Sequence, residues 1–417
     1  MTSYQIASRR RPRRKGAKAH PARPRPLADA VLNLIWQERH ISRAEIARRT
    51  ALSRSTVSEI VDALLTTGMV VDAGPGESLG GRRPIMLHFR DDACCILGVE
   101  MSGSHVAVVL TDLRGRVLDW ELRDHPVRSD PAGTRALITE LCATALRARK
   151  GGARRLVGIG VGVPSPVDPR NPFALSEVVL PEWRGTSGIE KLRERFGVPV
   201  MVDNDANLGA LAEQWWGAGR GISEFAYVKV GTGVGSGHVI HGELYRGATG
   251  FAGEIGHLSL DPDGEMCVCG LRGCLVLLVG SQALVRRAKE LREAEATGML
   301  VGEITMTTLE AAALAGDPLA MRVTREAAEH LGVAVAGMLN LMNPSVVIVG
   351  GGITTLGDRF LDPLRETVRM RTRVSGGVGP SIVMSGLGPR SVAVGAATLV
   401  LKEALANPRM FPAPGAH

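Results

Sequence analysis

Cysteine and long apolar runs are both scarce in this sequence. The chain has six cysteines in 417 residues, and its longest apolar run, Leu275 to Val279, is far too short to span a bilayer. No secretion signal is recognisable at the N-terminus, and so few cysteines without such a signal are not typical of a disulfide-stabilised secreted protein. We therefore expect a cytoplasmic protein with reduced thiols and no membrane partner.

Acidic residues are absent from the first 26 positions. That segment instead carries nine basic residues: Arg9, Arg10, Arg11, Arg13, Arg14, Lys15, Lys18, Arg23 and Arg25. Because the whole chain has a net charge of +8, the remainder is close to neutral. A Pro- and Ala-rich segment of this kind cannot bury a core, so we predict that residues 1–26 form a disordered basic arm attracted to nucleic acid. A solvated extension without function is the alternative.

Residues 27–90 have the pattern of a winged helix-turn-helix, which binds DNA. Ser42 and Glu45 form a capping box before a second helix, and Ser53 is placed to cap a third helix that ends at Gly68. A glycine-rich β-hairpin wing follows, and a helical bundle without DNA is the alternative. The residues expected to contact DNA lie on the second helix, at the start of the third and on the wing: Arg43, Ser53, Arg54, Ser55, Thr56, Ser58, Arg82 and Arg83.

Beyond residue 93 the pattern changes to strands that alternate with helices. The expected strands are short apolar runs: Cys95–Val99, Val106–Leu110, Leu156–Val161, Val198–Val202 and Val346–Val349. Alternation of this kind predicts α/β architecture, and the length of the chain suits more than one domain. We therefore expect a two-lobed α/β region over 93–405 and a flexible tail over 406–417.

Four metal-binding side chains lie within one short glycine-rich segment: His257, Cys267, Cys269 and Cys274. Three thiolates and one imidazole suit a closed tetrahedral zinc site, and nearby glycines permit the tight backbone path that such close ligands need. Catalytic zinc usually keeps one position open for water, so four ligands indicate structural Zn²⁺. Disulfides are the alternative, and the expected reducing compartment disfavours them.

The order of these ligands resembles that of a known family. The pattern C-x-C-G-x-x-G-C after G-E-x-G-H is similar to the signature of the ROK family, which contains sugar kinases and sugar-responsive transcriptional regulators. The segment SRAEIARRTALSRSTVSEIVDALLTTGMV resembles the winged helix-turn-helix of the regulators, which the kinases lack. The resemblance covers nearly all of 93–405 and implies an actin-like ATPase fold, in which two sugar-kinase-like lobes enclose sugar and nucleotide.

The resemblance also implies glycine-containing segments that hold a nucleotide. Their residues are Glu100, Gly103, Ser104, Gly231, Thr232, Gly233, Gly350 and Gly351. The first segment departs from the family, because kinases carry D-x-G-x-T where this chain has Glu100, Ser102 and Ser104. A longer acid and a side chain in place of glycine would displace a metal ion and crowd a phosphate, which disfavours phosphoryl transfer. ATP and Mg²⁺ are therefore expected as cofactors only if kinase activity is retained.

The sugar contacts that the resemblance implies are Asn204, Asp205, Glu254 and His257. Asp205 matches the catalytic base of the kinases, although the same carboxylate would accept a hydrogen bond from a sugar in a receptor, or could simply cap a helix. One ring nitrogen of His257 would bind zinc, which would orient the ring so that the other nitrogen faces the sugar. Two further departures are Val276, where the family has a sugar-binding glutamate, and Ser165, where it commonly has glycine.

These observations predict a DNA-binding transcriptional regulator, a repressor of carbohydrate metabolism genes, that senses a sugar or phosphosugar. We expect a homodimer or homotetramer, because one short helix reads too few bases of operator DNA. One alternative is an ATP-dependent, glucokinase-like sugar kinase with an added DNA-binding domain. Another is a C-terminal region that only dimerises and binds no ligand.

Overall fold

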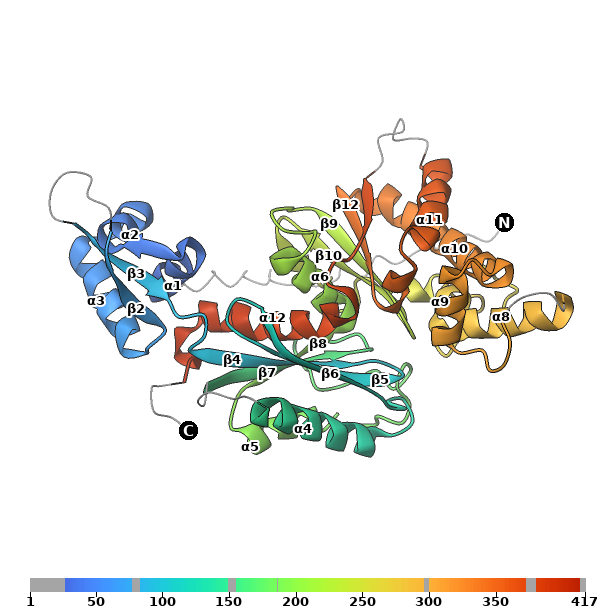
Figure 1. Cartoon of the computed structure of the whole chain (residues 1–417), viewed down its shortest axis with the longest axis horizontal. Coiled ribbons are helices and arrows are strands. Elements are labelled where there is room, and N and C mark those ends of the chain that lie inside the picture. The colour runs from blue at the N-terminus through green and yellow to red at the C-terminus, as the bar shows by residue number, and fades with distance from the viewer. Residues whose placement is uncertain are drawn as a thin grey trace, which may run out of the picture.

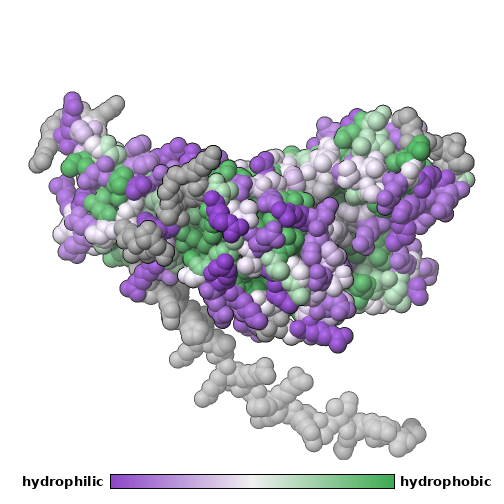
Figure 2. Space-filling model, turned by 60° about the horizontal axis from the view of Figure 1, so that its bottom comes forward, coloured by the Kyte–Doolittle hydropathy of each residue, from purple (hydrophilic) through white to green (hydrophobic). Residues whose placement is uncertain are grey.

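The computed structural model of the chain describes residues 27–76, 83–148, 155–185, 187–295, 300–372 and 380–412. The predicted basic arm (1–26) and Arg82 of the predicted wing lie outside these ranges. Three units follow one another along the chain: a small N-terminal domain and two larger α/β lobes (Figure 1). The face in Figure 2 is a mixture of polar side chains and smaller apolar patches. None of the described helices is long and apolar enough to cross a membrane.

The N-terminal domain is a winged helix-turn-helix, as predicted. Its elements are α1 (Leu27–Glu38), β1 (His40–Ser42), α2 (Arg43–Thr50), α3 (Arg54–Thr66), β2 (Val70–Pro75) and β3 (Ile85–Phe89). The Ser42 and Ser53 hydroxyls accept hydrogen bonds from the amides of Glu45 and Thr56, which confirms both predicted caps. A capping box also requires the Glu45 carboxylate to accept a hydrogen bond from the Ser42 amide. This half of the prediction is wrong, because both carboxylate oxygens of Glu45 bind Arg48. Strand β1 was not predicted; it completes an antiparallel sheet of order β1-β3-β2.

The first lobe contains a five-stranded sheet of order β6-β5-β4-β7-β8. Its elements are β4 (Cys94–Met101), β5 (His105–Thr111), β6 (Val117–Asp124), α4 (Pro131–Arg147), β7 (Arg155–Val163), η1 (Ile189–Lys191), α5 (Leu192–Phe196) and β8 (Val200–Asn204). Helix α6 (Asp205–Trp216) follows β8 directly and packs between the lobes, against the sheet of the second lobe. Helix α4 covers one face, and α12 (Ser391–Ala406) returns from the end of the chain to cover the other (Figure 1). A Cβ on Gly160 would lie 1.9 Å from the Ala396 carbonyl oxygen, so only glycine lets α12 approach this closely.

The second lobe repeats this topology in the order β11-β10-β9-β12-β13. Its elements are β9 (Phe225–Val230), β10 (Val234–Ile240), β11 (Glu243–Tyr245), η2 (Ile255–His257), α7 (Val276–Val279), α8 (Ser281–Glu295), α9 (Met306–Leu314), α10 (Pro318–Met342), β12 (Val346–Gly350), η3 (Gly352–Leu356), α11 (Asp358–Arg371), β13 (Ser381–Met384) and η5 (Gly388–Arg390). In each lobe a three-stranded antiparallel meander is followed by two parallel strands. This duplication confirms the predicted two-lobed α/β architecture.

An apolar core joins the N-terminal domain to the first lobe. Residues of α1 such as Val31 and Leu32 belong to the same buried cluster as Val400 and Leu401 of α12. The side-chain amide of Asn33 also donates to the Leu405 carbonyl oxygen. The two units therefore pack against each other, so that a movement of the lobe can reach α1 directly.

The C-terminal segment differs from the predicted flexible tail as far as Pro412. A short helix, η6 (Pro408–Met410), leads to Phe411, which is only 5 % exposed. The Phe411 ring lies edge-on to Phe89 of β3, with 6.4 Å between ring centroids. The prolines of this segment suggested a loose end, but the aromatic ring between them completes the core below the winged domain.

Candidate functional site

A polar cavity lies between the two lobes and has a volume of about 160 Å³. All four residues predicted to contact a sugar line it: Asn204, Asp205, Glu254 and His257. Ser165 and Val276, two of the positions where the sequence departs from the family pattern, line it as well. The fold therefore gathers these side chains from distant segments around one space that suits a small polar molecule.

Asp205 begins α6 and faces the cavity from the first lobe. The cap of this helix is Asn204, whose side-chain oxygen accepts hydrogen bonds from two amides of the first turn. The Asn204 side-chain nitrogen donates to the Ser165 carbonyl oxygen at 3.1 Å. Because Asn204 performs the capping, the Asp205 carboxylate is available for other contacts.

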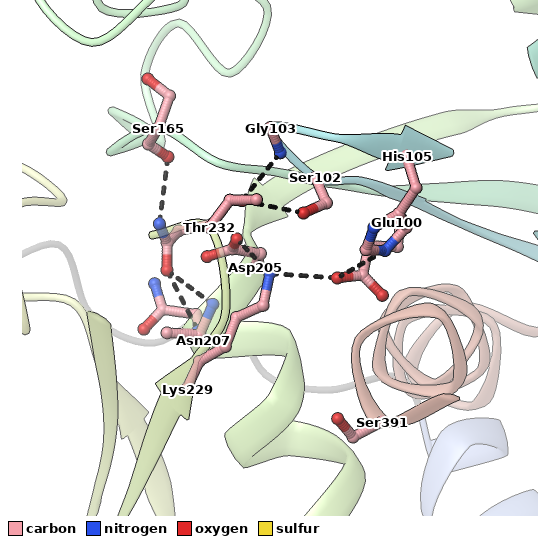
Figure 3. Close-up of polar contacts among 12 residues, drawn as sticks. Glu100, Ser102, Gly103, His105, Ser165, Asp205, Asn207, Lys229, Thr232 and Ser391 are labelled. Carbon is pink, nitrogen blue, oxygen red and sulfur yellow. Dashed lines mark hydrogen bonds and ion pairs between the residues drawn. The ribbon is translucent and has the colours of Figure 1, made fainter. Parts of the chain in front are cut away.

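Lys229 meets Asp205 from the second lobe. Its Nζ lies 2.6 Å from Asp205 Oδ2 and 3.0 Å from Glu100 Oε1 of β4 (Figure 3). Burial lowers the pKa of Lys229, but the two carboxylates outweigh it and raise that pKa, so the amine stays charged. Burial raises the pKa of Asp205, and the Lys229 charge opposes that rise. Lys229 was missed in the sequence, although a lone charged residue inside the apolar strand FAYVKV was a signal.

A second ion pair connects the same two lobes. Asp203, at the end of β8, accepts two hydrogen bonds from the Arg246 guanidinium, at 2.6 and 3.0 Å. Asp203 is 4 % exposed and also accepts from the side-chain amide of Asn207. Sequence reasoning missed this pair too, because nothing in the local pattern brings β8 and the segment after β11 together.

The two predicted phosphate hairpins touch each other directly. Thr232 Oγ1 accepts a hydrogen bond from the Gly103 amide at 3.1 Å and lies 3.1 Å from Ser102 Oγ (Figure 3). Ser104 is exposed, and its hydroxyl lies 3.5 Å from His105 Nδ1. The turn of the second hairpin is closed by a hydrogen bond from the Gly231 amide to the Gly233 carbonyl oxygen.

The third predicted nucleotide segment lies at the end of β12, outside the lining of the cavity. Gly350 pairs in register with Lys229 on the neighbouring strand. A Cβ on Gly350 would lie 2.2 Å from the Tyr227 hydroxyl, and Gly351 has a φ of +88°. Both glycines are thus required by packing alone, and a nucleotide contact there stays a prediction.

Glu254 and His257 line the cavity from the second lobe. Burial, followed by the charge of Asp205, raises the pKa of Glu254 to about 7. Burial and then Arg128 lower the pKa of His257. A carboxyl group and a neutral imidazole of this kind can each donate or accept a hydrogen bond, which matches the mixed character of sugar hydroxyls.

The predicted zinc ligands come together beside the cavity. The ligand atoms of His257, Cys267, Cys269 and Cys274 all lie within 4.8 Å of one another. His257 Nδ1 is 3.6 Å from Cys267 Sγ, and the sulfurs of Cys269 and Cys274 are 3.5 Å apart. Zinc–sulfur bonds of about 2.3 Å in a tetrahedron give edges of roughly 3.8 Å, so the donor set fits zinc.

The backbone around these ligands explains why the loop can close so tightly. Gly270 and Gly273 have φ angles of +89° and +59°. A Cβ on Gly273 would lie 1.8 Å from the Asp261 carbonyl oxygen. His257 Nδ1 faces the thiols, which leaves Nε2 for the cavity that His257 also lines.

The start of α3 presents several of the predicted DNA contacts to solvent. Arg54 and Ser55 are exposed, and the Arg54 guanidinium makes no hydrogen bond or ion pair with the described part of the chain. Thr56 and Ser58 are half-buried on the same helix, and Ser53 is its cap. These side chains lie at the N-terminal end of α3, which is the end of a recognition helix that enters the major groove, and their contact with DNA stays a prediction.

Two of the predicted basic contacts have different surroundings. Arg83 is exposed just before β3. Arg43, in contrast, binds Asp62 at 2.8 Å and so ties α2 to α3. The structure gives Arg43 this packing contact, and its contact with DNA stays a prediction.

Comparison with known proteins agrees with the architecture. The model of the ROK family matches residues 96–403, and a model described as winged helix-turn-helix DNA-binding matches residues 30–71. The xylose repressor of Caldicellulosiruptor bescii is 32 % identical over 383 residues, which cover 91 % of this chain and 96 % of that protein.

Two solved structures are also similar. A ROK family glucokinase from Streptomyces griseus, in complex with glucose and AMPPNP, is 32 % identical with a TM-score of 0.66 and covers 73 % of this chain and 98 % of its own. A ROK family transcriptional regulator, a homologue of the E. coli MLC protein, is 23 % identical with a TM-score of 0.75 and covers 92 % of this chain and 98 % of its own. The second likeness extends over the winged domain as well as both lobes.

Proposed function

This chain belongs to the ROK family, and from its winged helix-turn-helix domain and its repressor relatives we propose that it is a transcriptional repressor of carbohydrate metabolism genes. In this proposal α3 and the wing bind operator DNA, and the cavity between the lobes binds a sugar or phosphosugar that controls the affinity for the operator. The protein acts in the cytoplasm, and the zinc is structural.

The observation that carries the proposal is the position of α6 between the cavity and the DNA-binding domain. The helix begins at Asp205 in the cavity and ends at Trp215 and Trp216, which pack against Trp36 of α1. Twelve residues of α-helix span roughly 18 Å. A ligand that binds one arrangement of the lobes more tightly shifts the equilibrium toward that arrangement by the difference in affinity. Helix α6 then carries the change in the lobes to the winged domain.

The relatives support the regulatory role in particular. The xylose repressor of C. bescii matches this chain along nearly its whole length, whereas the glucokinase matches 73 % of it. Since the winged domain is packed on the first lobe through a shared core, it is an integral part of the molecule. A DNA-binding domain that is packed on the lobe in this way is suited to respond to a ligand in the cavity.

The zinc site serves the proposed sugar site. Zinc bound to Nδ1 of His257 fixes the ring orientation and the tautomer, and so presents Nε2 to a sugar hydroxyl. The metal also joins the loop of Cys267 and Cys269 to the segment that leads into α7, where Val276 lines the cavity. Loss of zinc then loosens one wall of the cavity.

We propose further that the protein is a homodimer or homotetramer. Helix α3 has 13 residues, and one recognition helix reads only a few base pairs. Two copies related by a two-fold axis read two half-sites, so the operator should be palindromic.

The proposal is tested by genome-wide footprinting of the tagged protein, followed by binding to the best site in vitro with a panel of sugars and phosphosugars. Discrete palindromic sites near sugar-uptake or catabolic genes, with affinity changed by one sugar, support it. Diffuse binding that depends only on salt concentration contradicts it.

A second candidate function is an ATP-dependent sugar kinase. The carboxylate of Asp205 in the cavity favours it, as does the 32 % identity with the S. griseus glucokinase. A coupled ATP-consumption assay over the same sugars tests this candidate. Turnover that Asp205→Asn abolishes would establish the kinase.

A further inference from the structure

Lys229 is the only charged residue of β9, whose six residues are all buried. Its Nζ holds two carboxylates that both belong to the first lobe, Glu100 on β4 and Asp205 at the start of α6 (Figure 3). The exposed fractions of Lys229, Glu100 and Asp205 are 6, 3 and 9 %. The three charges thus meet across the lobes with almost no contact with solvent.

A buried ammonium is costly unless it is paired, and two buried carboxylates side by side are equally costly without a cation. The triad of Lys229, Glu100 and Asp205 meets both requirements, because the ammonium has two carboxylate partners and the carboxylates share one cation. Nζ has three hydrogens, and two of them are directed at carboxylate oxygens at 2.6 and 3.0 Å. The carboxylates keep Lys229 charged by raising its pKa.

Two carboxylate oxygens that converge on one point are also a donor set for Mg²⁺, which binds oxygen at about 2.0–2.1 Å. In this chain that point is filled by Nζ. An ammonium and a divalent cation cannot share it, because the positive charges repel each other strongly in a buried environment. The residues present therefore do not fit a magnesium ion between Glu100 and Asp205.

The contact between the two neighbouring hairpins supports the same conclusion. The Gly103 amide, a donor suited to a phosphate oxygen, is bound to Thr232 Oγ1 at 3.1 Å. Ser102 Oγ lies 3.1 Å from the same hydroxyl. The place where a phosphate would enter between the hairpins is closed by side chains of the protein itself.

We propose that Lys229 is a built-in cation that ties the two lobes together and takes the position of a divalent metal ion, so that the cleft excludes a metal–nucleotide complex. This inference does not depend on which sugar the cavity binds or on whether the protein binds DNA, and it opposes the kinase as the second candidate function. It rests on the triad and on the contact between the hairpins.

The test compares the full-length, zinc-loaded protein with Lys229→Met, which keeps the length of the side chain and removes the charge. Binding of MnCl₂ is measured by the loss of the free Mn²⁺ signal in electron paramagnetic resonance. Lys229→Met should bind one Mn²⁺ per chain at least tenfold more tightly than the wild type. The double variant Lys229→Met/Glu100→Gln, which has the same net charge as the wild-type triad, should lose that gain.

Thermal unfolding with and without MnCl₂ covers the case in which Lys229→Met is unstable. Manganese should raise the Tm of Lys229→Met and leave the wild type and the double variant unchanged. Equal stoichiometric binding of Mn²⁺ or MgATP by the wild type and Lys229→Met would overturn the proposal. A Lys229→Met protein whose Mn²⁺ affinity and Tm response match those of the wild type would overturn it as well.

Discussion

The indole rings of Trp36 and Trp215 lie with their centroids 5.5 Å apart and join the winged domain to α6. Trp216 extends the cluster at 6.4 Å from Trp36, whose indole N–H donates to the Leu113 carbonyl oxygen. The Arg114 guanidinium covers the same ring at 4.5 Å. Tryptophan packing of this kind is rigid, so it is suited to transmit a displacement of α6 to α1.

Trp215→Leu should therefore weaken the response to the sugar. We expect the sugar-induced change in operator affinity to fall at least threefold, while the affinity of the cavity for the sugar changes little. Fluorescence anisotropy with labelled operator measures the first quantity and calorimetry the second. Phe196→Leu, on α5 and packed against a separate apolar cluster of the first lobe, is the control; equal losses in both variants would argue against α6 as the connection.

Removal of zinc should affect both stability and the cavity. Cys269→Ser removes one of four ligands, and we expect zinc content to fall well below one per chain and Tm to drop by roughly 5 °C or more. The affinity for the sugar should fall as well, because His257 is no longer held. Cys142→Ala, a thiol outside the cluster, should keep stoichiometric zinc. Full zinc and an unchanged Tm in Cys269→Ser would exclude the metal site.

Glu254→Gln should weaken binding of the sugar. Because burial raises the pKa of Glu254 to about 7, the carboxylate form predominates only above that pH. There, a hydrogen bond to the charged group contributes about 1.5–3 kcal/mol, which corresponds to a loss in affinity of roughly 10- to 150-fold. Glu224→Gln, a side chain on the outer surface that binds the amide of His241, should leave the affinity unchanged. Calorimetry on both variants distinguishes a contact in the cavity from a general effect of charge.

Two kinds of contact with DNA are expected: contacts of the winged domain with bases, and contacts of the basic arm with the DNA backbone. Arg54→Ala should cost about 1–3 kcal/mol on the operator and relax base discrimination at one position. Deletion of residues 1–26 should instead weaken binding to every sequence and flatten the dependence on salt concentration. Titrations at several salt concentrations, with operator and random DNA, measure both effects. If both changes reduced specific and random binding equally, this division would be wrong.

Gly160→Ala should destabilise the first lobe, because the new Cβ would lie 1.9 Å from the carbonyl oxygen of Ala396 in α12. Overpacking of this kind costs about 1–3 kcal/mol or more. Gly337→Ala is the matched control, since nothing lies within 4 Å of its Cβ on the exposed face of α10. That control should stabilise the protein by about 1 kcal/mol. Denaturant unfolding of both variants tests the pair.

Several parts of the molecule were predicted from a local signal in the sequence. Ser42 and Ser53 are capping residues next to helices, and the zinc ligands lie within eighteen positions of one another. The alternation of apolar strands and helices was likewise enough for the two-lobed fold. In each of these cases the interacting residues are close in sequence or follow a regular period. The cavity residues Asn204, Asp205, Glu254 and His257 come from distant segments, and the family resemblance predicted them where no local pattern could.

The parts that were missed depend on contacts between distant segments. Lys229 reaches Glu100 across more than a hundred positions, and Asp203 reaches Arg246 between two lobes. The buried Phe411 lies among prolines that suggested a tail. Such pairings follow from the way the sheets and lobes meet, which no local pattern determines.

The most direct test of the proposed function is a titration of the full-length protein with operator DNA and random DNA, with and without the candidate sugar, at one fixed salt concentration. We predict that one sugar or phosphosugar changes the affinity for the operator at least tenfold and leaves the affinity for random DNA unchanged. An affinity for the operator that no sugar or phosphosugar alters, or one equal to that for random DNA, would contradict the account.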